Sequence, residues 1–230
     1  MARYLPLFPL RIVVFPGEKL NLHVFEPRYK QLVLECVAEE KTFGIPTYIQ
    51  SGVGAYGTEM KILNIEKKYS NGEMDIRTKG LKVFKILHLD KMAPGRLYAG
   101  GEVEDVAYTD DEDILTKQKI TEYLKILYES LGVSKLFEEL PGNFRSFDVG
   151  HHLGLTLEQE YALLQLQHEA ERQEAILQHL QHIMPVVQET ERLKDRVRLN
   201  GHFKNLLPPD FECRPYMAGL KNEKPCRFAK

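Results

Sequence analysis

Apolar and polar residues alternate with a period of two along much of the first half of the chain. Leu20, Leu22 and Val24 are separated by Asn21 and His23, which is the pattern of a strand with one buried face. Runs of aromatic and β-branched residues repeat this signal further along the chain. We expect strands over residues 20–24, 43–49, 56–69, 73–78, 81–87 and 97–106.

Glycine and proline divide these strands and mark one helix between them. Asn71-Gly72 predicts a tight hairpin, because both residues tolerate positive φ, and Lys79-Gly80 predicts a second turn. Pro27 suits the first turn of a helix over residues 27–38. The apolar stripe of this helix consists of Leu32, Val33, Cys36 and Val37.

The apolar period changes to 3.6 after an acidic turn at residues 109–113. One face of the helix that follows carries Ile120, Leu124, Leu127, Tyr128 and Leu131. Thr156 and Gln159 form a capping box, so a further helix begins there and is expected to run to about Met184. Pro185 then kinks this helix or starts a new one.

These patterns predict an α+β chain with three parts. Residues 4–108 form a barrel-like β-domain around one helix, and residues 109–200 form an α-helical bundle. Residues 201–230 contain four prolines, and six basic residues against three acidic ones give this segment a charge of 6 − 3 = +3. We interpret it as an extended basic tail.

Composition narrows the class of protein further. The formal net charge of −2 creates no global field for nucleic acid, which is therefore not an expected partner. No run of about 18 apolar residues occurs, so no membrane-spanning segment is expected. Cys36, Cys213 and Cys226 form no closely spaced pair, which predicts a cytoplasmic protein without a disulfide framework.

A glycine pattern imitates a dinucleotide-binding motif. Gly52, Gly54 and Gly57 spell G-x-G-x-x-G, and Asp75 follows at roughly the required distance of about 20 residues. A dinucleotide site needs these glycines to open a helix whose N-terminus faces the phosphates. The residues that follow them lead into a hairpin instead, so we favour a glycine-rich strand connection.

The histidines do not predict a metal site. His168, His179 and His182 could share a helical face, but no H-E-x-x-H or Cys-x-x-Cys accompanies them. His151 and His152 are adjacent and therefore point in different directions, so solvated or helix-capping roles are expected. The chain contains no G-x-S-x-G and no P-loop, so we expect no catalytic residue, no metal and no cofactor.

Several segments taken together resemble the N-terminal, substrate-binding domain of Lon proteases. The opening run Leu5-Pro6-Leu7-Phe8-Pro9-Leu10-Arg11, with Val13-Val14-Phe15-Pro16 after it, is similar to the start of that domain. Phe25-Glu26-Pro27-Arg28-Tyr29 is similar to the version in stand-alone members of the family. Gly57-Thr58, Asn71-Gly72 and Leu153-Gly154-Leu155-Thr156 match later elements. The resemblance covers about residues 4–190.

The resemblance implies a fold and a function. The β-domain would be a PUA-like pseudo-barrel with one helix, followed by the helical bundle. The chain would be a relative of the Lon peptidases, without an AAA+ or a protease domain. It would therefore not be an enzyme but would bind unfolded or extended polypeptides, as an adaptor or regulator in ATP-dependent proteolysis or quality control. A protease or a chaperone, or a second copy of the chain, would be its protein partner.

Strand addition would hold such a polypeptide at an exposed sheet edge, with pockets for alternate side chains. The candidate peptide-binding residues are Phe8, Phe15, Phe25, Arg28, Tyr29, Tyr48 and Tyr56. Aromatic residues are commonly buried, so most of these are also candidates for the core, Phe25 and Tyr29 among them. Two alternatives stay open: an RNA- or nucleotide-binding PUA-like protein, and a small-ligand binder that uses the cleft between barrel and bundle.

Overall fold

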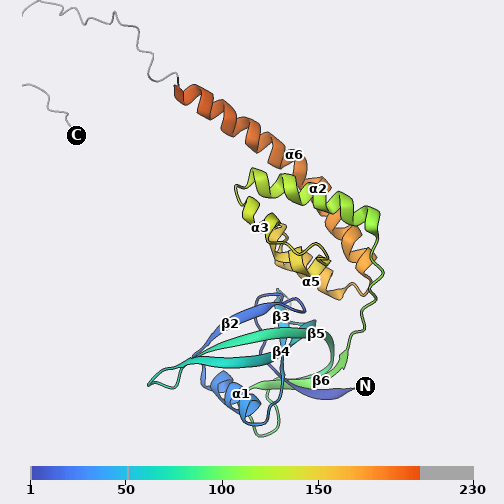
Figure 1. The fold of residues 1–230 in the computed structure, drawn as a ribbon. Coiled ribbons are helices and arrows are strands. Elements are labelled where there is room, and N and C mark those ends of the chain that lie inside the picture. Colours follow the sequence, from blue (N-terminus) through green and yellow to red (C-terminus); the bar gives the residue numbers. More distant parts are fainter. Residues whose placement is uncertain (1, 51, 203–230) are drawn as a thin grey trace, which may run out of the picture. The chain divides into compact units, whose positions relative to one another are not determined.

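The computed structural model describes residues 2–50 and 52–202. It divides into two compact units, Met1–Val187 and Gln188–Lys230. The first unit contains one β-sheet and a series of helices, so the chain is of the mixed α+β type that the sequence predicts (Figure 1).

The sheet has six strands in the order β2-β5-β4-β3-β1-β6, and β5 also pairs with β6. β1 and β3 are parallel, and the other neighbours are antiparallel. The expected PUA-like pseudo-barrel is not confirmed, and the structure establishes a single six-stranded sheet. The strands are β1 (Arg3–Leu7), β2 (Lys19–Val24), β3 (Phe43–Ile49), β4 (Gly52–Lys68), β5 (Met74–Asp90) and β6 (Ala99–Asp105).

The turn predicted at Lys79-Gly80 is wrong, because β5 passes straight through it as one strand. Gly80 allows the backbone of Phe15 to approach β5 closely, and it does not form a turn. A Cβ built on it would lie 2.6 Å from the carbonyl oxygen of Phe15. The hairpin at Asn71-Gly72 is confirmed, and Gly72 has a φ of 78°.

The glycine pattern lies on strand β4, as the sequence favoured, and no helix opens after it. Gly57 faces the neighbouring strand so closely that a Cβ would lie 2.5 Å from the carbonyl oxygen of Ile45. The motif therefore reflects strand packing and does not form a phosphate-binding turn.

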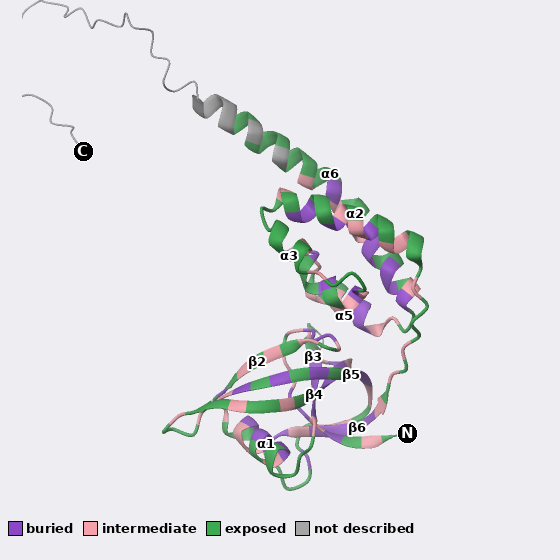
Figure 2. Cartoon of the chain, in the orientation of Figure 1, coloured by how far each residue is buried: buried purple, intermediate pink, exposed green. Residues whose placement is uncertain are grey.

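Helix α1 (Pro27–Ala38) has the predicted limits and covers part of the sheet. Its residues Tyr29, Leu32, Val33 and Cys36 are buried against a core cluster that includes Phe43 and Met60 of the strands (Figure 2). Val37, expected on the same stripe, is exposed.

The second half of the first unit is helical. Its elements are α2 (Ile114–Ser130), α3 (Ser134–Glu138), α4 (Ser146–Val149), the 3₁₀ turn η1 (Gly150–His152), α5 (Leu157–Gln165) and α6 (Glu169–His202). The predicted face of α2 is buried at Ile120, Leu124, Leu127 and Tyr128. Leu131 is exposed, because it caps the helix instead of continuing it.

The single helix expected from Thr156 to about Met184 is wrong, since two helices occupy this stretch. The chain leaves helical geometry between them to make a short parallel bridge. Thr109 N–H donates to the carbonyl of Gln167 (2.9 Å), and Glu169 N–H donates to the carbonyl of Thr109 (3.0 Å). A contact with a segment about 60 residues earlier in the chain therefore sets this break.

Phe15 and Val83, from the strand-rich half, pack in one core cluster with Leu124, Leu164 and Leu180 of the helices. The limits 4–108 and 109–200 remain predictions about domains. Of the predicted tail, Gly201 and His202 belong to α6, and residues 203–230 lie outside the described residues.

Candidate functional site

A groove of about 610 Å³ opens between two segments that are distant in sequence. Residues of the 11–20 segment line one side, and residues of the 147–160 segment line the other. We call it the 11–20/147–160 groove. Its apolar lining includes Ile12, Pro16, Leu20, Phe147 and Leu157, and its charged or titratable lining includes Arg11, Glu18, Asp148, His151, His152 and Glu160.

Glu18 is held on the first side by its neighbours. Gly17 has a φ of 89° and donates its N–H to the carbonyl of Gly80 (3.0 Å), while Gly80 N–H donates to the carbonyl of Glu18 (2.8 Å). The Glu18 carboxylate turns back to accept the N–H of Phe15 (2.9 Å). The backbone of β5 thus fixes the acidic side chain at the groove.

The second side is built from α4, η1 and the start of α5. Thr156 caps α5 in a capping box with Gln159, so Leu157 is the first residue of the helix and Glu160 follows one turn later. Gly150 lets this side approach the first: a Cβ on it would lie 2.5 Å from the ring of Phe15. Phe15 also stacks on Phe147, with 5.1 Å between ring centroids.

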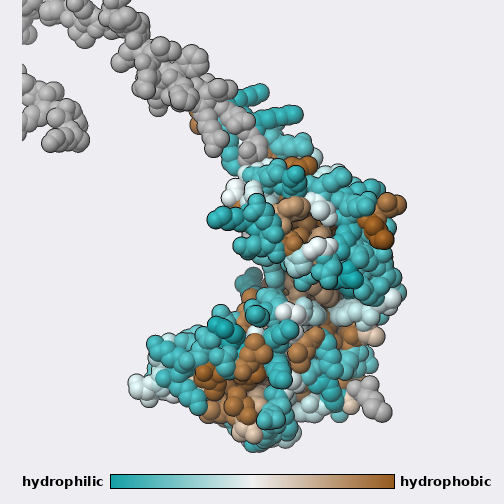
Figure 3. Space-filling model, viewed as in Figure 1, coloured by the Kyte–Doolittle hydropathy of each residue, from teal (hydrophilic) through white to brown (hydrophobic). Residues whose placement is uncertain are grey.

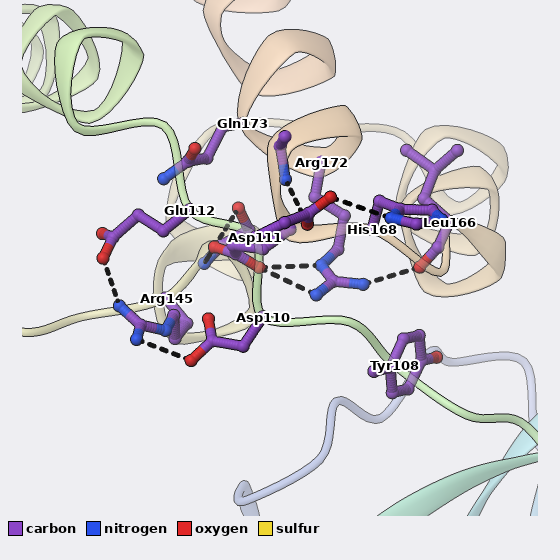
Figure 4. A network of polar contacts seen from close by, with 12 residues as sticks. Tyr108, Asp110, Asp111, Glu112, Arg145, Leu166, His168, Arg172 and Gln173 are labelled. Carbon is purple, nitrogen blue, oxygen red and sulfur yellow. Dashed lines mark hydrogen bonds and ion pairs between the residues drawn. The ribbon is translucent and has the colours of Figure 1, made fainter.

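A buried ion pair holds the beginning of α4 against α6 (Figure 4). Glu169 accepts the N–H and the hydroxyl of Ser146 (2.8 and 2.9 Å) and pairs with the Arg172 guanidinium at 2.8 Å. The side chains of Arg172 and Glu169 are only 5% and 2% exposed. Arg172 also donates to the carbonyl of Leu166 (2.6 Å). This pair therefore positions the helix that carries Phe147 and Asp148.

His151 joins the two sides of the groove. Its Nε2 lies 3.1 Å from Glu18 Oε2, and its Nδ1 lies 2.8 Å from Glu160 Oε1. The hydrogen bond to Glu18, supported by the one to Glu160, raises the pKa of His151 to about 9, although burial opposes the shift. Both ring nitrogens can donate only in the protonated form, so the side chain is an imidazolium between two carboxylates.

His151 is exposed, as expected of a solvated histidine, but its pairing with two carboxylates was not expected. Its partners lie 133 and 9 residues away in sequence, so no local pattern indicates the pairing. The neighbouring His152 is exposed and also lines the groove.

The groove has the chemistry of a binding surface. One imidazolium pairs with two of its carboxylates, and its lining also contains several apolar residues. Within residues 2–50 and 52–202, no group of three His, Cys, Asp or Glu could hold a metal ion. Cys36, the free thiol of α1, is buried, and burial raises its pKa to about 12, so it is not a reactive nucleophile.

Three of the aromatic residues predicted to bind peptide are buried. Phe8 stacks on Tyr29, with ring centroids 3.7 Å apart, and Phe15 lies in the cluster shared with the helices. Their role in the structure is packing, as expected for large aromatic side chains. Of these three, only Phe15 touches the groove, through His151 and Phe147.

The other four predicted residues lie nearer the surface. Phe25 and Tyr48 are 58% and 48% exposed, so the expectation that Phe25 belongs to the core is wrong. Arg28 pairs with Glu26 and lies 4.5 Å from the ring of Tyr29, which places it beside the Phe8–Tyr29 stack. Tyr56 is half-buried, and its N–H donates to the hydroxyl of Tyr161 (3.0 Å).

Apolar side chains also reach the surface outside the groove. Leu63 and Leu81 are exposed on β4 and β5, and Figure 3 shows apolar patches among polar residues over the strands. Among the described helices, none is both long enough and apolar enough to cross a membrane.

Comparison with known proteins agrees with the resemblance read from the sequence. The family model described as the ATP-dependent protease La (LON) substrate-binding domain matches residues 4–182. A Lon N-terminal domain protein from Xanthomonas campestris is similar, with a TM-score of 0.60 and 27% identity over 76% of this chain and 97% of that one. The N-terminal domain of a Mycobacterium avium complex Lon protease shares the fold, with a TM-score of 0.57 and 16% identity over 78% of this chain and 98% of that one.

Proposed function

Because this chain belongs to the family of ATP-dependent protease La (LON) substrate-binding domains, we propose that it binds unfolded or extended polypeptides without cleaving them. In this proposal it acts in the cytoplasm as an adaptor or regulator of ATP-dependent proteolysis or quality control, with a protease or a chaperone as partner. The PUA-like pseudo-barrel belongs to the proposal too, supported by the pairing of β5 with β2, β4 and β6.

The 11–20/147–160 groove is the observation that carries this proposal. It is open, large enough for side chains of a bound segment, and lined by apolar residues beside carboxylates. Unfolded polypeptides offer the apolar side chains that folded proteins bury. Affinity for such clients is expected to be modest, because an unfolded segment loses conformational entropy when it is ordered.

Titration of fluorescently labelled, unfolded casein with the purified chain tests the proposal. We expect a saturable rise in fluorescence anisotropy and competition by other unfolded proteins, but not by their folded forms. Absence of binding across several unfolded clients would overturn the proposed function.

A charge placed in the groove tests where the client binds. Leu157 is the first residue of α5, a position that accepts glutamate because it lies at the positive end of the helix. Leu157→Glu should therefore fold and weaken casein binding by about tenfold, equivalent to about 1.4 kcal/mol. Ile114→Glu is the matched control, since Ile114 is the exposed first residue of α2 and lies outside the groove.

A second candidate function is the binding of a small ligand in the same groove. The carboxylates of Glu18, Asp148 and Glu160 outnumber the two cations of the lining, Arg11 and His151, which favours a small cationic molecule with an apolar body. A thermal-shift screen of such molecules separates the two functions. Two results together would favour the small-ligand function. The wild type would not bind casein, and a ligand would raise the melting temperature of the wild type but not of Leu157→Glu.

A further inference from the structure

We propose that the client segment binds by adding a strand to the free edge of β2, next to the 11–20/147–160 groove. This inference rests on the proposed polypeptide-binding function and specifies how the client is held. β2 is the terminal strand in the sheet order, and among the described strands it pairs with β5 alone. Leu20 belongs to β2 and also lines the groove, so the two features are continuous.

The edge of β2 has the properties that strand addition requires. The strand is six residues long and contains no proline, and its register with β5 runs without a shift from Lys19↔Lys79 to Val24↔Met74. Lys19, Asn21 and His23 are exposed. An unpaired row of N–H and C=O groups on a regular exposed strand is a template for another extended chain.

The register shows which backbone groups are available. Gly80 N–H donates to the carbonyl of Glu18, so the residue just before β2 directs its carbonyl toward β5. Hydrogen-bonded and non-hydrogen-bonded pairs alternate along antiparallel strands. Leu20, Leu22 and Val24 therefore direct their backbone groups toward β5. The backbone groups of Lys19, Asn21 and His23 point to the free edge.

The side chains of β2 indicate the chemistry of the client. Leu20 and Leu22 are half-buried against the core cluster under α1, on one face of the sheet. A strand paired with β2 continues this face with every second side chain. An apolar residue at alternate positions would extend the face, and one of them would reach the groove beside Leu20.

The charges at the end of β2 indicate what should flank the apolar residues. Glu18 immediately precedes the strand, and Asp148 and Glu160 line the same groove. His151 pairs with one carboxylate oxygen of Glu18 and one of Glu160, and Asp148 is exposed. We therefore identify the occupant as an extended segment with apolar residues at alternate positions and a lysine or arginine at the end that enters the groove.

A proline placed on the free edge tests this mode of binding. Asn21→Pro removes an outward N–H without removing a bond to β5, and prolines are tolerated on edge strands. The probe is a labelled peptide of about nine residues with alternating leucine and threonine and two terminal lysines. We expect Asn21→Pro to lower its affinity by about tenfold and Asn21→Ala, which keeps the N–H, by less than about twofold.

A modified ligand gives the same test without altering the protein. Two probes carry N-methyl groups on the two alternate sets of residues. Only one of these patterns removes the donors that would pair with β2, and that probe should bind at least about tenfold more weakly than the other. Equal binding of both methylated probes and of Asn21→Pro, while casein still binds, would overturn strand addition and leave the proposed function intact. Loss of casein binding by the wild type itself would remove the proposed function as well.

A second copy of the chain is the competing occupant of this edge. Sedimentation of the wild type and of Asn21→Pro over a range of concentrations distinguishes the two. A dimer that Asn21→Pro abolishes and that the peptide does not dissociate would overturn the assignment of the edge to clients. A wild-type monomer that binds the peptide would support it.

Discussion

At the scale of single residues, the charge of His151 should make the stability of the chain depend on pH. The pKa of His151 is raised from 6.5 to about 9, so its pairing with Glu18 and Glu160 stabilises the fold fully below pH 6.5. The contribution is lost as the pH rises through 9. His151→Gln should lower the free energy of unfolding by about 1–2 kcal/mol near neutral pH, a modest value because the side chain is 31% exposed.

Urea unfolding of the wild type and of His151→Gln between about pH 6 and pH 10 measures this contribution as the difference between their free energies of unfolding. Groups that titrate equally in both proteins do not affect the difference. It should shrink toward zero at the alkaline end. His152→Gln is the control, since His152 is the exposed neighbour, and should match the wild type throughout. A His151 difference that is the same at both ends of the range would contradict the assigned charge.

The buried pair of Glu169 and Arg172 should be far more sensitive than its counterpart on the surface. Glu169→Gln leaves the Arg172 guanidinium buried without a counter-charge, so we expect a loss of about 3–5 kcal/mol in the free energy of unfolding. Glu189→Gln is the matched control, because Glu189 and Arg192 form an exposed pair at the same i,i+3 spacing on α6. It should change stability by less than about 0.5 kcal/mol. Similar losses in both variants would contradict this interpretation.

Residue roles could be predicted from sequence only where the neighbourhood is local. The Thr156–Gln159 capping box lies within one turn and is confirmed. The pairing of His151 with Glu18 could not be predicted, because Glu18 is distant from it in sequence, near the other end of the first unit. Burial of Phe8 and exposure of Phe25 likewise depend on which face of the sheet α1 covers, and residue type alone does not encode that.

At the scale of elements, the glycines of β4 should tolerate substitution poorly. A Cβ on Gly57 would lie 2.5 Å from the backbone of Ile45 and of Pro46, so β3 and β4 would have to separate locally. Gly57→Ala should cost about 1–3 kcal/mol of stability in thermal or urea unfolding. Gly142→Ala, at a glycine with open space around it and no positive φ, should have an effect within about 0.5 kcal/mol. Wild-type stability of Gly57→Ala would show that the strands can relax.

Element limits were predictable where one physical signal dominates. Pro27 fixes the start of α1 and the aromatic and β-branched run fixes β3, and both elements have the predicted limits. Local sequence signals gave wrong limits where tertiary contacts determine where an element ends. Gly80 indicates a turn in isolation but is required by the approach of Phe15, and the bridge to Thr109 divides the helix predicted after Thr156.

At the scale of the whole molecule, the α+β class and the family could be derived from the sequence, whereas the candidate site could not. The groove exists only because residues 11–20 and 147–160 meet in the fold, and the motifs in each segment do not indicate that the two meet. The core is likewise formed by segments that are distant in sequence, since Phe15 and Val83 pack among helical residues far along the chain. Sequence patterns report local periodicity, and these sites arise from long-range packing.

The division of the chain into two units predicts that the second one is dispensable for the stability of the first. The last fully buried side chain of α6 is Met184, Val187 is half-buried, and the described side chains after it are exposed. A chain shortened to residues 1–190 should therefore melt within about 2 °C of the full chain, because little apolar area leaves the core. Calorimetry of both chains measures this difference, and casein titration of the shortened chain tests the groove alone.

Shortening to residues 1–180 is the contrasting variant, because it removes the buried Met184. It should lower the melting temperature by several degrees. Each kcal/mol of stability lost corresponds to about 4–8 °C in a small domain and to less in a larger one. If the chain of 190 residues melted as early as that of 180, the residues beyond 190 would have to stabilise the first unit directly.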